Sequence, residues 1–250
     1  MSRRLVFRLI GLALLAGFAA LAVLPARWAM VMLPQSWPLA IVDASGTLWS
    51  GSATIAVGTP AYRRTLPEPL RWQVSFANGL KLRVTHPWLG GPLILTPGWT
   101  GMGVSGQTLK LPASALGALD ARIAAIGPGG ELSLKWPASV VGSSRRPAGS
   151  TLLEAQWHNA VSALTPVRPL GDYTLVLKQG EQKNRVDLVL DTRQGPLMLN
   201  GTGALDGNAS RFDGTAQVDP AASKSTHAAL HDVLAALGPE RNNQTILHFH

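Results

Sequence analysis

The sequence predicts a mainly β protein with a few helices, in which an N-terminal transmembrane helix precedes a curved, largely antiparallel β-sheet domain. Three observations predict it: a long apolar run near the N-terminus, many short alternating or β-branched stretches between Gly and Pro residues, and two stretches of helical periodicity. The 250 residues include 26 Gly and 18 Pro, and only 14% are charged. With no cysteine, the chain can form no disulfide, thiolate metal site or cysteine nucleophile.

The first 30 residues form the predicted cytoplasmic stub and membrane anchor. Residues 5–24 are apolar except for Arg8, and twenty helical residues span the roughly 30 Å hydrocarbon core of a bilayer. Four of the 22 basic residues and none of the 14 acidic ones lie in this segment, with three arginines at or before position 8. The positive-inside rule therefore keeps the N-terminus cytoplasmic. In a bacterium, this orientation anchors the chain in the inner membrane and places residues 31–250 in the periplasm.

A cleaved signal peptide is the alternative interpretation of this segment. Ala20-Leu21-Ala22 has the small-x-small spacing of a cleavage site, but it lies inside the apolar run. The run is also longer than the apolar core of a typical signal peptide. The sequence therefore favours an uncleaved anchor, and both interpretations export the rest of the chain.

The exported part, residues 31–250, is predicted to be a β-rich domain. Two helices, residues 114–126 and 227–237, have apolar residues three or four apart and are each followed by Gly-Pro. A curved antiparallel sheet with one core face is the simplest packing, and a long twisted sheet of this kind can form a groove. The predicted strands are residues 40–42, 46–49, 51–57, 70–76, 80–85, 91–96, 131–136, 153–159, 173–178, 184–192, 195–204, 211–218 and 244–249.

Recurring turn and strand words suggest that the domain consists of two duplicated halves. Trp72 matches Trp157, and Gly-Pro-Leu-Ile-Leu at residues 91–95 matches Gly-Pro-Leu-Met-Leu at residues 195–199. The difference in residue number between matching segments of the two halves increases steadily along the chain, as it would if the second copy contained insertions. We therefore predict repeats at residues 40–127 and 128–238. Chance recurrence of common strand and turn words is the alternative.

Motifs that carry chemistry are few. Residues 101–106 spell G-x-G-x-x-G, but residues 107–112 after it look like a strand, whereas a dinucleotide site needs a helix there. His227 and His231 are one helical turn apart and could share a metal, but the glutamate of a zinc-protease motif is missing. Exposed histidines are the simpler interpretation. We therefore assign no catalytic, cofactor-binding or metal-binding residue and predict that the protein is not an enzyme.

The charged residues also argue against catalysis and against nucleic-acid binding. Beyond the anchor, the basic residues form no dense run; Arg63-Arg64 and Arg145-Arg146 are isolated pairs. The acids are scattered beside turns or at alternate strand positions, which is typical of solvated edges. They include Asp172, Glu181, Asp187, Asp191, Asp206, Asp213 and Asp219.

The eight tryptophans are the most informative side chains. Four of them, Trp49, Trp72, Trp136 and Trp157, fall on predicted strands, where we expect them to fill the core. Trp88 and Trp99 flank Gly- and Pro-rich turns instead. An exposed ring at such a turn could contact a protein or a lipid.

The order of these elements resembles the type II secretion system protein N family, also called general secretion pathway protein N. The likeness covers nearly the whole chain and consists of glycine and aromatic strand patterns rather than catalytic signatures. Similar Gly-x-Gly-x-Leu-x-Gly words also occur in AsmA-like envelope proteins. Besides the N-terminal membrane helix, the segments that carry the resemblance are residues 44–53, 70–72, 106–116, 130–136, 169–175 and 195–207.

The resemblance implies an accessory inner-membrane component of the type II secretion machinery, a scaffold subunit supporting export of folded periplasmic proteins across the outer membrane. Its implied partners are other subunits of the inner-membrane platform, bound by strand addition or through an apolar patch, and it carries over no active site. The alternative function is that of an AsmA-like envelope protein that binds or transfers lipid along a curved sheet groove. A periplasmic enzyme would need converging acids or histidines, which the sequence does not offer.

Overall fold

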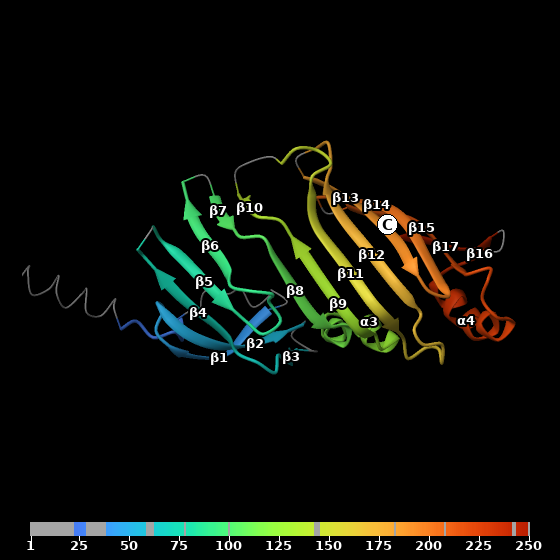
Figure 1. Ribbon diagram of the computed structural model, residues 1–250, viewed down its shortest axis with the longest axis horizontal. Coiled ribbons are helices and arrows are strands. Elements are labelled where there is room, and N and C mark those ends of the chain that lie inside the picture. The colour runs from blue at the N-terminus through green and yellow to red at the C-terminus, as the bar shows by residue number, and fades with distance from the viewer. Residues whose placement is uncertain are drawn as a thin grey trace, which may run out of the picture.

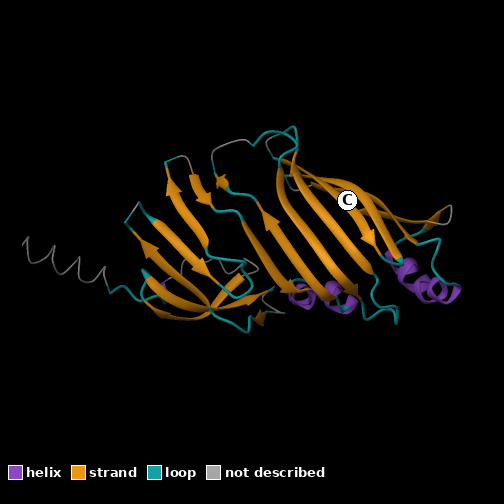
Figure 2. Cartoon of the chain, in the orientation of Figure 1, coloured by secondary structure: helices purple, strands orange, loops and turns teal. Residues whose placement is uncertain are grey.

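The computed structural model describes residues 23–28, 39–58, 63–77, 79–99, 101–142, 146–182, 184–207, 209–241 and 244–249. Within these residues the chain forms two open antiparallel sheets, with helices along the lower edge of the C-terminal sheet (Figures 1 and 2). The predicted mainly β, antiparallel fold is confirmed, although the single predicted sheet is divided into two. In the part of the chain that is described, no helix is long and apolar enough to cross a membrane. The predicted anchor falls on residues 5–24, nearly all of which lie outside that part.

The N-terminal sheet is a meander in which each strand pairs antiparallel with its neighbours. Most consecutive strands in the chain are adjacent in the sheet, as short connections require. The order across the sheet is β1 (Leu39–Gly46), β2 (Ser50–Val57), β4 (Leu70–Ser75), β5 (Lys81–Thr85), β6 (Leu93–Gly98), β7 (Gly101–Val104) and β10 (Ser139–Val141), with β3 (Arg64–Thr65) beside β2.

The C-terminal sheet has longer strands and the same antiparallel pairing. Its central strands, β11 to β15, have nine to eleven residues each, so their twist bends the sheet into a curved surface. The order across the sheet is β16 (Glu240–Arg241), β17 (Gln244–Phe249), β15 (Ala209–Val218), β14 (Leu197–Asp206), β13 (Arg185–Gln194), β12 (Gly171–Gln179), β11 (Thr151–Val161), β9 (Gly129–Trp136) and β8 (Gln107–Pro112).

Two bent strands join the sheets. Only Ser105-Gly106 separates β7 from β8, and only Pro137-Ala138 separates β9 from β10. β7 pairs with β10 and β8 with β9 in one continuous register, so the ladder passes through the bend without a slip. The indole N–H of Trp136 donates to the Ser105 carbonyl across it at 3.2 Å. A Cβ on Gly106 would lie 2.9 Å from the Ala138 nitrogen, so glycine is required for this close approach.

The predicted strand at residues 46–49 is wrong, because Gly46 is the last residue of β1 and residues 47–49 form the hairpin turn between β1 and β2. Gly46 has a φ of +90°, a backbone conformation that favours glycine. The Thr47 N–H donates to the Ser50 carbonyl at 2.9 Å, which closes the turn. The other predicted strands correspond to observed ones with ends shifted by a few residues, and the strand expected at residues 107–112 is β8.

The predicted helix at residues 114–126 is divided into two shorter pieces. A 3₁₀ helix, η1, spans Ala113–Ala118, and an α-helix, α3, spans Ala121–Ile126. Asp120 between them has extended backbone angles, and its carboxylate accepts a hydrogen bond from the Arg122 N–H at 2.7 Å. An aspartate that caps a new helix cannot also continue the preceding one, which explains the break.

The helix predicted at residues 227–237 is confirmed as α4, Lys224–Leu237. It begins one turn earlier than predicted because the Ser223 side chain accepts a hydrogen bond from the Thr226 N–H at 3.1 Å. Leu230 and Val233 of this helix pack against Tyr173 and Leu197 in the main hydrophobic cluster. Among the described residues, Leu230 is the only large side chain that is fully buried.

The predicted repeats do not coincide with the two sheets. β8 belongs to the first predicted repeat but to the C-terminal sheet, and β10 belongs to the second repeat but to the N-terminal sheet. In addition, β13 separates β12 from β14, whereas the strands matched to these two, β5 and β6, are adjacent. An insertion in the second copy would therefore have to be a whole strand. The duplication itself stays a prediction.

Shortening Leu230 to alanine should destabilise the whole C-terminal sheet, since α4 is attached to it through this side chain. We expect Leu230→Ala to lower the free energy of unfolding by about 2–5 kcal/mol, measured by denaturant titration followed by tryptophan fluorescence. Leu164→Ala is the matched control, because Leu164 is 49% exposed, and should change it by less than about 0.5 kcal/mol. Equal effects of the two substitutions would contradict this assignment of the core.

Candidate functional site

One side of the C-terminal sheet is almost entirely apolar, and we call it the inner face. The strand register places every second residue of β8, β9 and β11 to β15 on it. Its apolar members are Leu109, Leu111, Leu132, Leu134, Trp136, Leu153, Ala155, Trp157, Tyr173, Leu175, Leu177, Val186, Leu188, Leu190, Leu197, Leu199, Leu205, Phe212, Ala216 and Val218.

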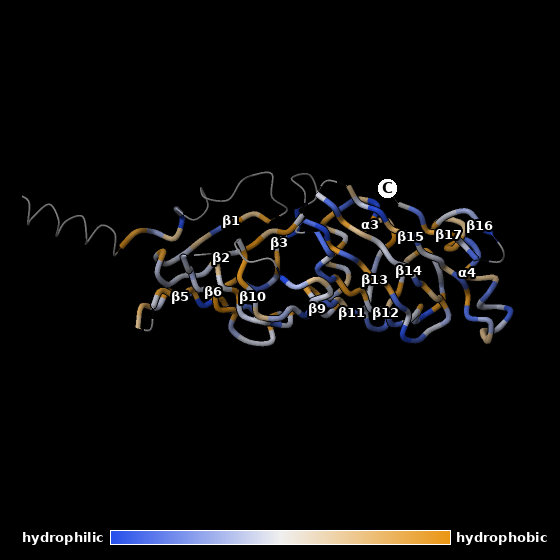
Figure 3. Tube along the Cα trace, turned by 90° about the horizontal axis from the view of Figure 1, so that it is seen from above, coloured by the Kyte–Doolittle hydropathy of each residue, from blue (hydrophilic) through white to orange (hydrophobic). Residues whose placement is uncertain are grey.

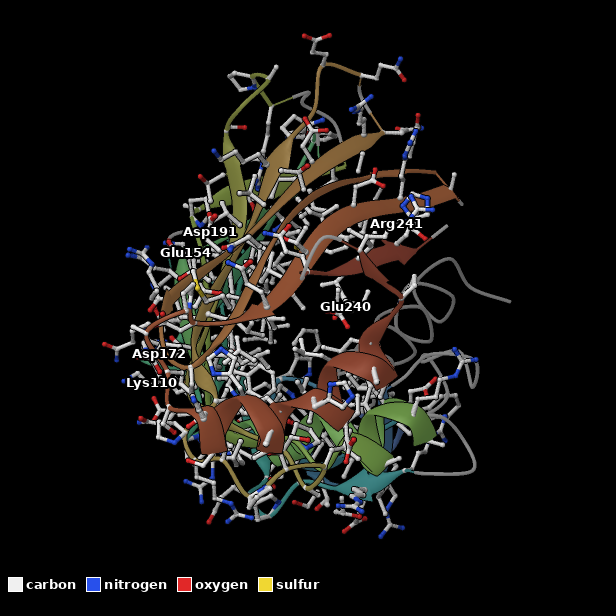
Figure 4. The ribbon with its side chains drawn as sticks, turned by 90° about the vertical axis from the view of Figure 1, so that its right-hand side faces the viewer. Lys110, Glu154, Asp172, Asp191, Glu240 and Arg241 are labelled. Carbon is white, nitrogen blue, oxygen red and sulfur yellow. The ribbon has the colours of Figure 1, made fainter. Side chains whose placement is uncertain are left out.

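The residues between them form a mostly polar outer face. Lys110, Glu154, Asp172 and Asp191 point away from the side of the sheet on which α4 lies, as Figure 4 shows. The alternation is also visible in Figure 3, where the colour changes repeatedly between hydrophobic and hydrophilic along the strands. This period of two is typical of a sheet with one solvated face. It predicts that the inner face is the one that packs or binds.

Helices cover the inner face at one end only. α4 packs on Trp157, Tyr173 and Leu197 near the lower ends of the strands. Figure 4 shows that the sheet curves around α4, so the inner face is concave. Leu177 and Leu188, farther along the same strands, do not belong to that cluster and are only partly buried. The apolar surface therefore continues well beyond the helix that stabilises it.

Phe212 lies flat on the inner face over three glycines of β14 and β15. A Cβ added to Gly201 would lie 2.5 Å from Cζ of this ring, one on Gly214 would lie 2.9 Å from Cε1, and one on Gly203 would lie 3.1 Å from Cδ2. Because glycine has no side chain, the Phe212 ring covers the inner face at these three positions. An aromatic ring over strand glycines restores the apolar contact that glycine lacks. Because the ring lies against the sheet, the concave face is low at this place, and we call this region the Phe212 floor.

The polar groups of four aromatic side chains donate hydrogen bonds to main-chain carbonyl groups. The indole N–H groups of Trp72, Trp136 and Trp157 each donate to a main-chain carbonyl, at 3.0, 3.2 and 2.8 Å. The Tyr173 hydroxyl donates to the Leu197 carbonyl at 2.9 Å, and burial raises the pKa of this phenol. Trp72, Trp157 and Tyr173 also pack in hydrophobic clusters, as predicted for these two tryptophans, whereas Trp136 is partly buried at the bend and belongs to neither cluster.

The other three tryptophans considered in the sequence analysis, Trp49, Trp88 and Trp99, have different surroundings. Trp49 lies in the β1–β2 turn rather than on a strand, with its ring centroid 5.6 Å from that of Phe76. Trp88 is partly buried, and its ring lies edge-on to His86 at 5.2 Å. Trp99, in the β6–β7 turn, is fully exposed. Only Trp99 therefore fits the expectation of an exposed ring at a turn.

The N-terminal sheet has a smaller apolar hollow of its own. Its volume is about 380 Å³, and it opens on one face near the β4–β5 and β6–β7 turns. Sequence reasoning missed it because its residues come from five separate segments of the chain. It is lined by Trp49, Val74, Leu80, Leu82, Leu95, Pro97 and Met102.

Asp172 on the outer face fixes an irregularity in β11. Its carboxylate accepts hydrogen bonds from the Asn159 N–H at 2.6 Å and from Gln194 at 2.9 Å, and His158 lies 3.7 Å away. Asn159 has a positive φ of 48° at the bulge between Trp157 and Ala160. The hydrogen bond from Asn159 is the main reason why the pKa of Asp172 is below its ordinary value. These contacts are those of a structural carboxylate.

The other titratable residues considered in the sequence do not converge. His227 and His231 border a hollow of about 610 Å³ beside α4, together with Glu240. Across the described ranges, no three His, Asp or Glu residues are placed to hold one metal ion. Asp187 and Asp213 pair on their own strands with Arg185 and Arg211, at 2.9 and 3.1 Å. The residues 101–106 form β7 and the bend after it, followed by a strand and not by a helix.

Adding a methyl group at Gly201 should disturb the Phe212 floor. The new Cβ would meet the ring and also the main chain of β15, so we expect Gly201→Ala to lower the free energy of unfolding by about 1–3 kcal/mol. Thr202→Ala is the control on the outer face and should cost less than about 1 kcal/mol in the same denaturant titration. A Gly201→Ala variant as stable as the unaltered protein would show that the ring does not lie on this glycine.

Asp172 should contribute to stability in a pH-dependent way. Because its pKa is lower in the folded chain than its ordinary value of 3.8, the stabilisation is present above pH 3.8 and is lost as the pH falls below it. We expect Asp172→Asn to lower the free energy of unfolding by about 1 kcal/mol at pH 7. In acid, the difference in unfolding free energy between this variant and the unaltered protein should become smaller. Denaturant titrations at several pH values measure this; parallel curves for the two proteins would contradict it.

Comparison with known proteins identifies the family. The profile of one family, described as type II secretion system (T2SS), protein N, matches residues 38–247, which include all strands of both sheets except the last two residues of β17. No curated protein and no solved structure matches the chain. The match covers most of the chain and confirms the resemblance of its strand patterns. The chain belongs to the type II secretion system protein N family and is a component of the type II secretion machinery.

Proposed function

We propose that the protein is an accessory scaffold subunit of the type II secretion platform in the bacterial inner membrane. Residues 5–24 anchor it with the N-terminus in the cytoplasm, and both sheets lie in the periplasm. The protein acts by binding other platform subunits, not by catalysis, and so supports the export of folded periplasmic proteins across the outer membrane. Family membership supports the secretion role, and the charge pattern of the first 30 residues supports the anchor.

The uncovered part of the inner face is the observation that carries this proposal. A stable monomer seldom leaves a continuous row of leucines in contact with water, so a surface of this kind usually has a partner. Leu153, Leu177 and Leu188 lie on neighbouring strands beyond the reach of α4 and are partly exposed. An apolar helix or strand of another subunit would bury them, while the polar outer face stays in water.

The connection to the predicted anchor favours binding near the membrane. The Ala26 N–H donates to the Gly46 carbonyl at 3.0 Å, and the Leu48 N–H donates to the Leu24 carbonyl at 2.9 Å. The chain therefore leaves the predicted span directly onto the β1–β2 turn without a long linker. A domain held so closely to the membrane has a high effective concentration toward other membrane-bound subunits.

A lipid-binding function is the second candidate, and the same face favours it. The inner face is aliphatic along its length, and Phe212 over its glycines leaves a low floor that an acyl chain could follow. A solid core would have argued for a scaffold alone, but in the described residues only one large side chain is fully buried. The two functions differ in the molecule that contacts the leucines of the inner face, which is a platform subunit in the first and a lipid acyl chain in the second.

Photo-crosslinking in intact cells should separate the two functions. We would place a benzophenone amino acid at Leu177 on the inner face and, in a matched control, at Val176, the adjacent residue on the outer face. The scaffold predicts that the probe at residue 177 captures platform subunits, identified by mass spectrometry, and that the probe at 176 captures them much less. Phospholipid on the probe at 177 without any platform subunit would instead establish the lipid function. Equal capture at both positions would exclude the inner face as the binding surface.

A further inference from the structure

Large apolar side chains are exposed together at one end of the N-terminal sheet. Trp99 is fully exposed, and Phe76, Leu80, Met102 and Val141 are 62%, 44%, 41% and 59% exposed. Water-exposed side chains of this size are common when scattered, but a group of them marks a contact surface. We call this surface the turn end.

The strand register shows that these residues share one end of the sheet. Leu82 pairs with Leu95, so the β4–β5 turn, which holds Phe76 and Leu80, lies beside the β6–β7 turn, which holds Trp99. Met102 pairs with Val141, which places the end of β10 beside the β6–β7 turn. Figure 1 shows these turns side by side along the upper left edge of the molecule.

The chain arriving from the predicted membrane span reaches the same end. Residues 24–26 are hydrogen-bonded to the β1–β2 turn, and Trp49 of that turn contacts Phe76. The Val74 N–H donates to the Trp49 carbonyl at 2.6 Å, which joins this turn to the end of β4. The turn end is therefore the end of the N-terminal sheet at which the chain from the predicted anchor is hydrogen-bonded.

A cationic face extends from the turn end along β4 and β5, with Lys81 next to the turn and Arg71 farthest from it. Arg71, Lys81 and Arg83 lie on the same face of β4 and β5, as their pairing register requires. Arg71 and Arg83 border a polar hollow of about 410 Å³ that also includes Ser45, Ser50 and Ser52. In β1, β2, β4 and β5 the only acidic residue is Asp43. Cations and hydroxyl groups next to apolar turns suit a surface that carries phosphate groups over hydrocarbon.

We propose that the turn end rests in the headgroup layer of the phospholipid bilayer. Phe76, Leu80 and Trp99 insert between the lipids, where aromatic rings are favoured, and the guanidinium and ammonium groups of β4 and β5 face lipid phosphates. This inference rests on the proposed function for one element, the anchor at residues 5–24. Charge complementarity and continuity with that anchor argue for a bilayer rather than another protein. The contact would direct the C-terminal sheet away from the membrane.

Site-specific labelling of the full-length protein tests the depth of the turn end. Because the chain has no cysteine, Trp99→Cys gives a single attachment point for an NBD fluorophore. In vesicles of phosphatidylethanolamine and phosphatidylglycerol, we expect blue-shifted emission, strong quenching by doxyl-labelled lipid and little quenching by iodide. Leu164→Cys is the matched control, because Leu164 is also an exposed apolar residue but lies in the C-terminal half. Its label should show the opposite quenching pattern.

The outcomes separate this inference from the proposed anchor. A protein that does not float with the vesicles would overturn both. A protein that floats but carries an iodide-accessible label at residue 99, as at 164, would overturn the membrane contact alone, even if added platform subunits later protected that label. The combined variant Arg71→Gln, Lys81→Gln, Arg83→Gln should float normally but show several-fold weaker lipid quenching at residue 99. Unchanged quenching in that variant would overturn the role of the cations.

Discussion

The structure depends on the alternation of apolar and polar residues being kept in register across the strands of the C-terminal sheet. The pairings on the inner face mostly align an apolar residue with another apolar residue or with a glycine, as in Leu175 with Leu190 and Leu188 with Gly203, so a slip of one residue between two strands would move a row of apolar side chains into water. One of the places where the register shifts is the bulge in β11 between Trp157 and Ala160, and Asp172 fixes it from the outer face. The apolar face, its curvature and its attachment to α4 all follow from this constraint.

The same alternation explains why so little of the protein is a closed core. A sheet with one apolar face needs a second layer, and α4 supplies that layer only where Leu230 and Val233 reach Tyr173 and Leu197. In the N-terminal sheet the buried cluster is made of Ala26, Ala44 and Ala53, which are small side chains. A sheet built in this way leaves part of its apolar face without a second layer, while its polar outer face is hydrated.

Much of this fold could be predicted from the sequence, because alternation and Gly or Pro breaks mark long strands directly. The failures lie where local hydrogen bonds decide: the turn at Gly46 and Thr47, the cap at Asp120, and strands as short as β3 and β10 that have no period to read. The family followed from strand words, but the inner face did not. Which leucines share a face is known only when the partners of each strand are known, and Phe212 meets its glycines across a register that sequence spacing does not contain.

The bend between the sheets contributes to the relative orientation of the two halves of the molecule. Both crossing strands are continuous in the chain and in their pairing, with Ser105-Gly106 and Pro137-Ala138 at the bend. The loop before β6 adds a second connection, because the Gly90 N–H donates to the Thr108 carbonyl of β8 at 2.8 Å and the Lys110 N–H of β8 donates to the Trp88 carbonyl at 2.7 Å. Hydrogen-bonded strands transmit rotation without stretching, and the strands from β11 to β15 extend outward from this point. A change in the angle of the bend would therefore displace the far strands of the concave leucine surface more than β8 and β9, and it would also have to break or shift the hydrogen bonds between residues 88–90 and β8.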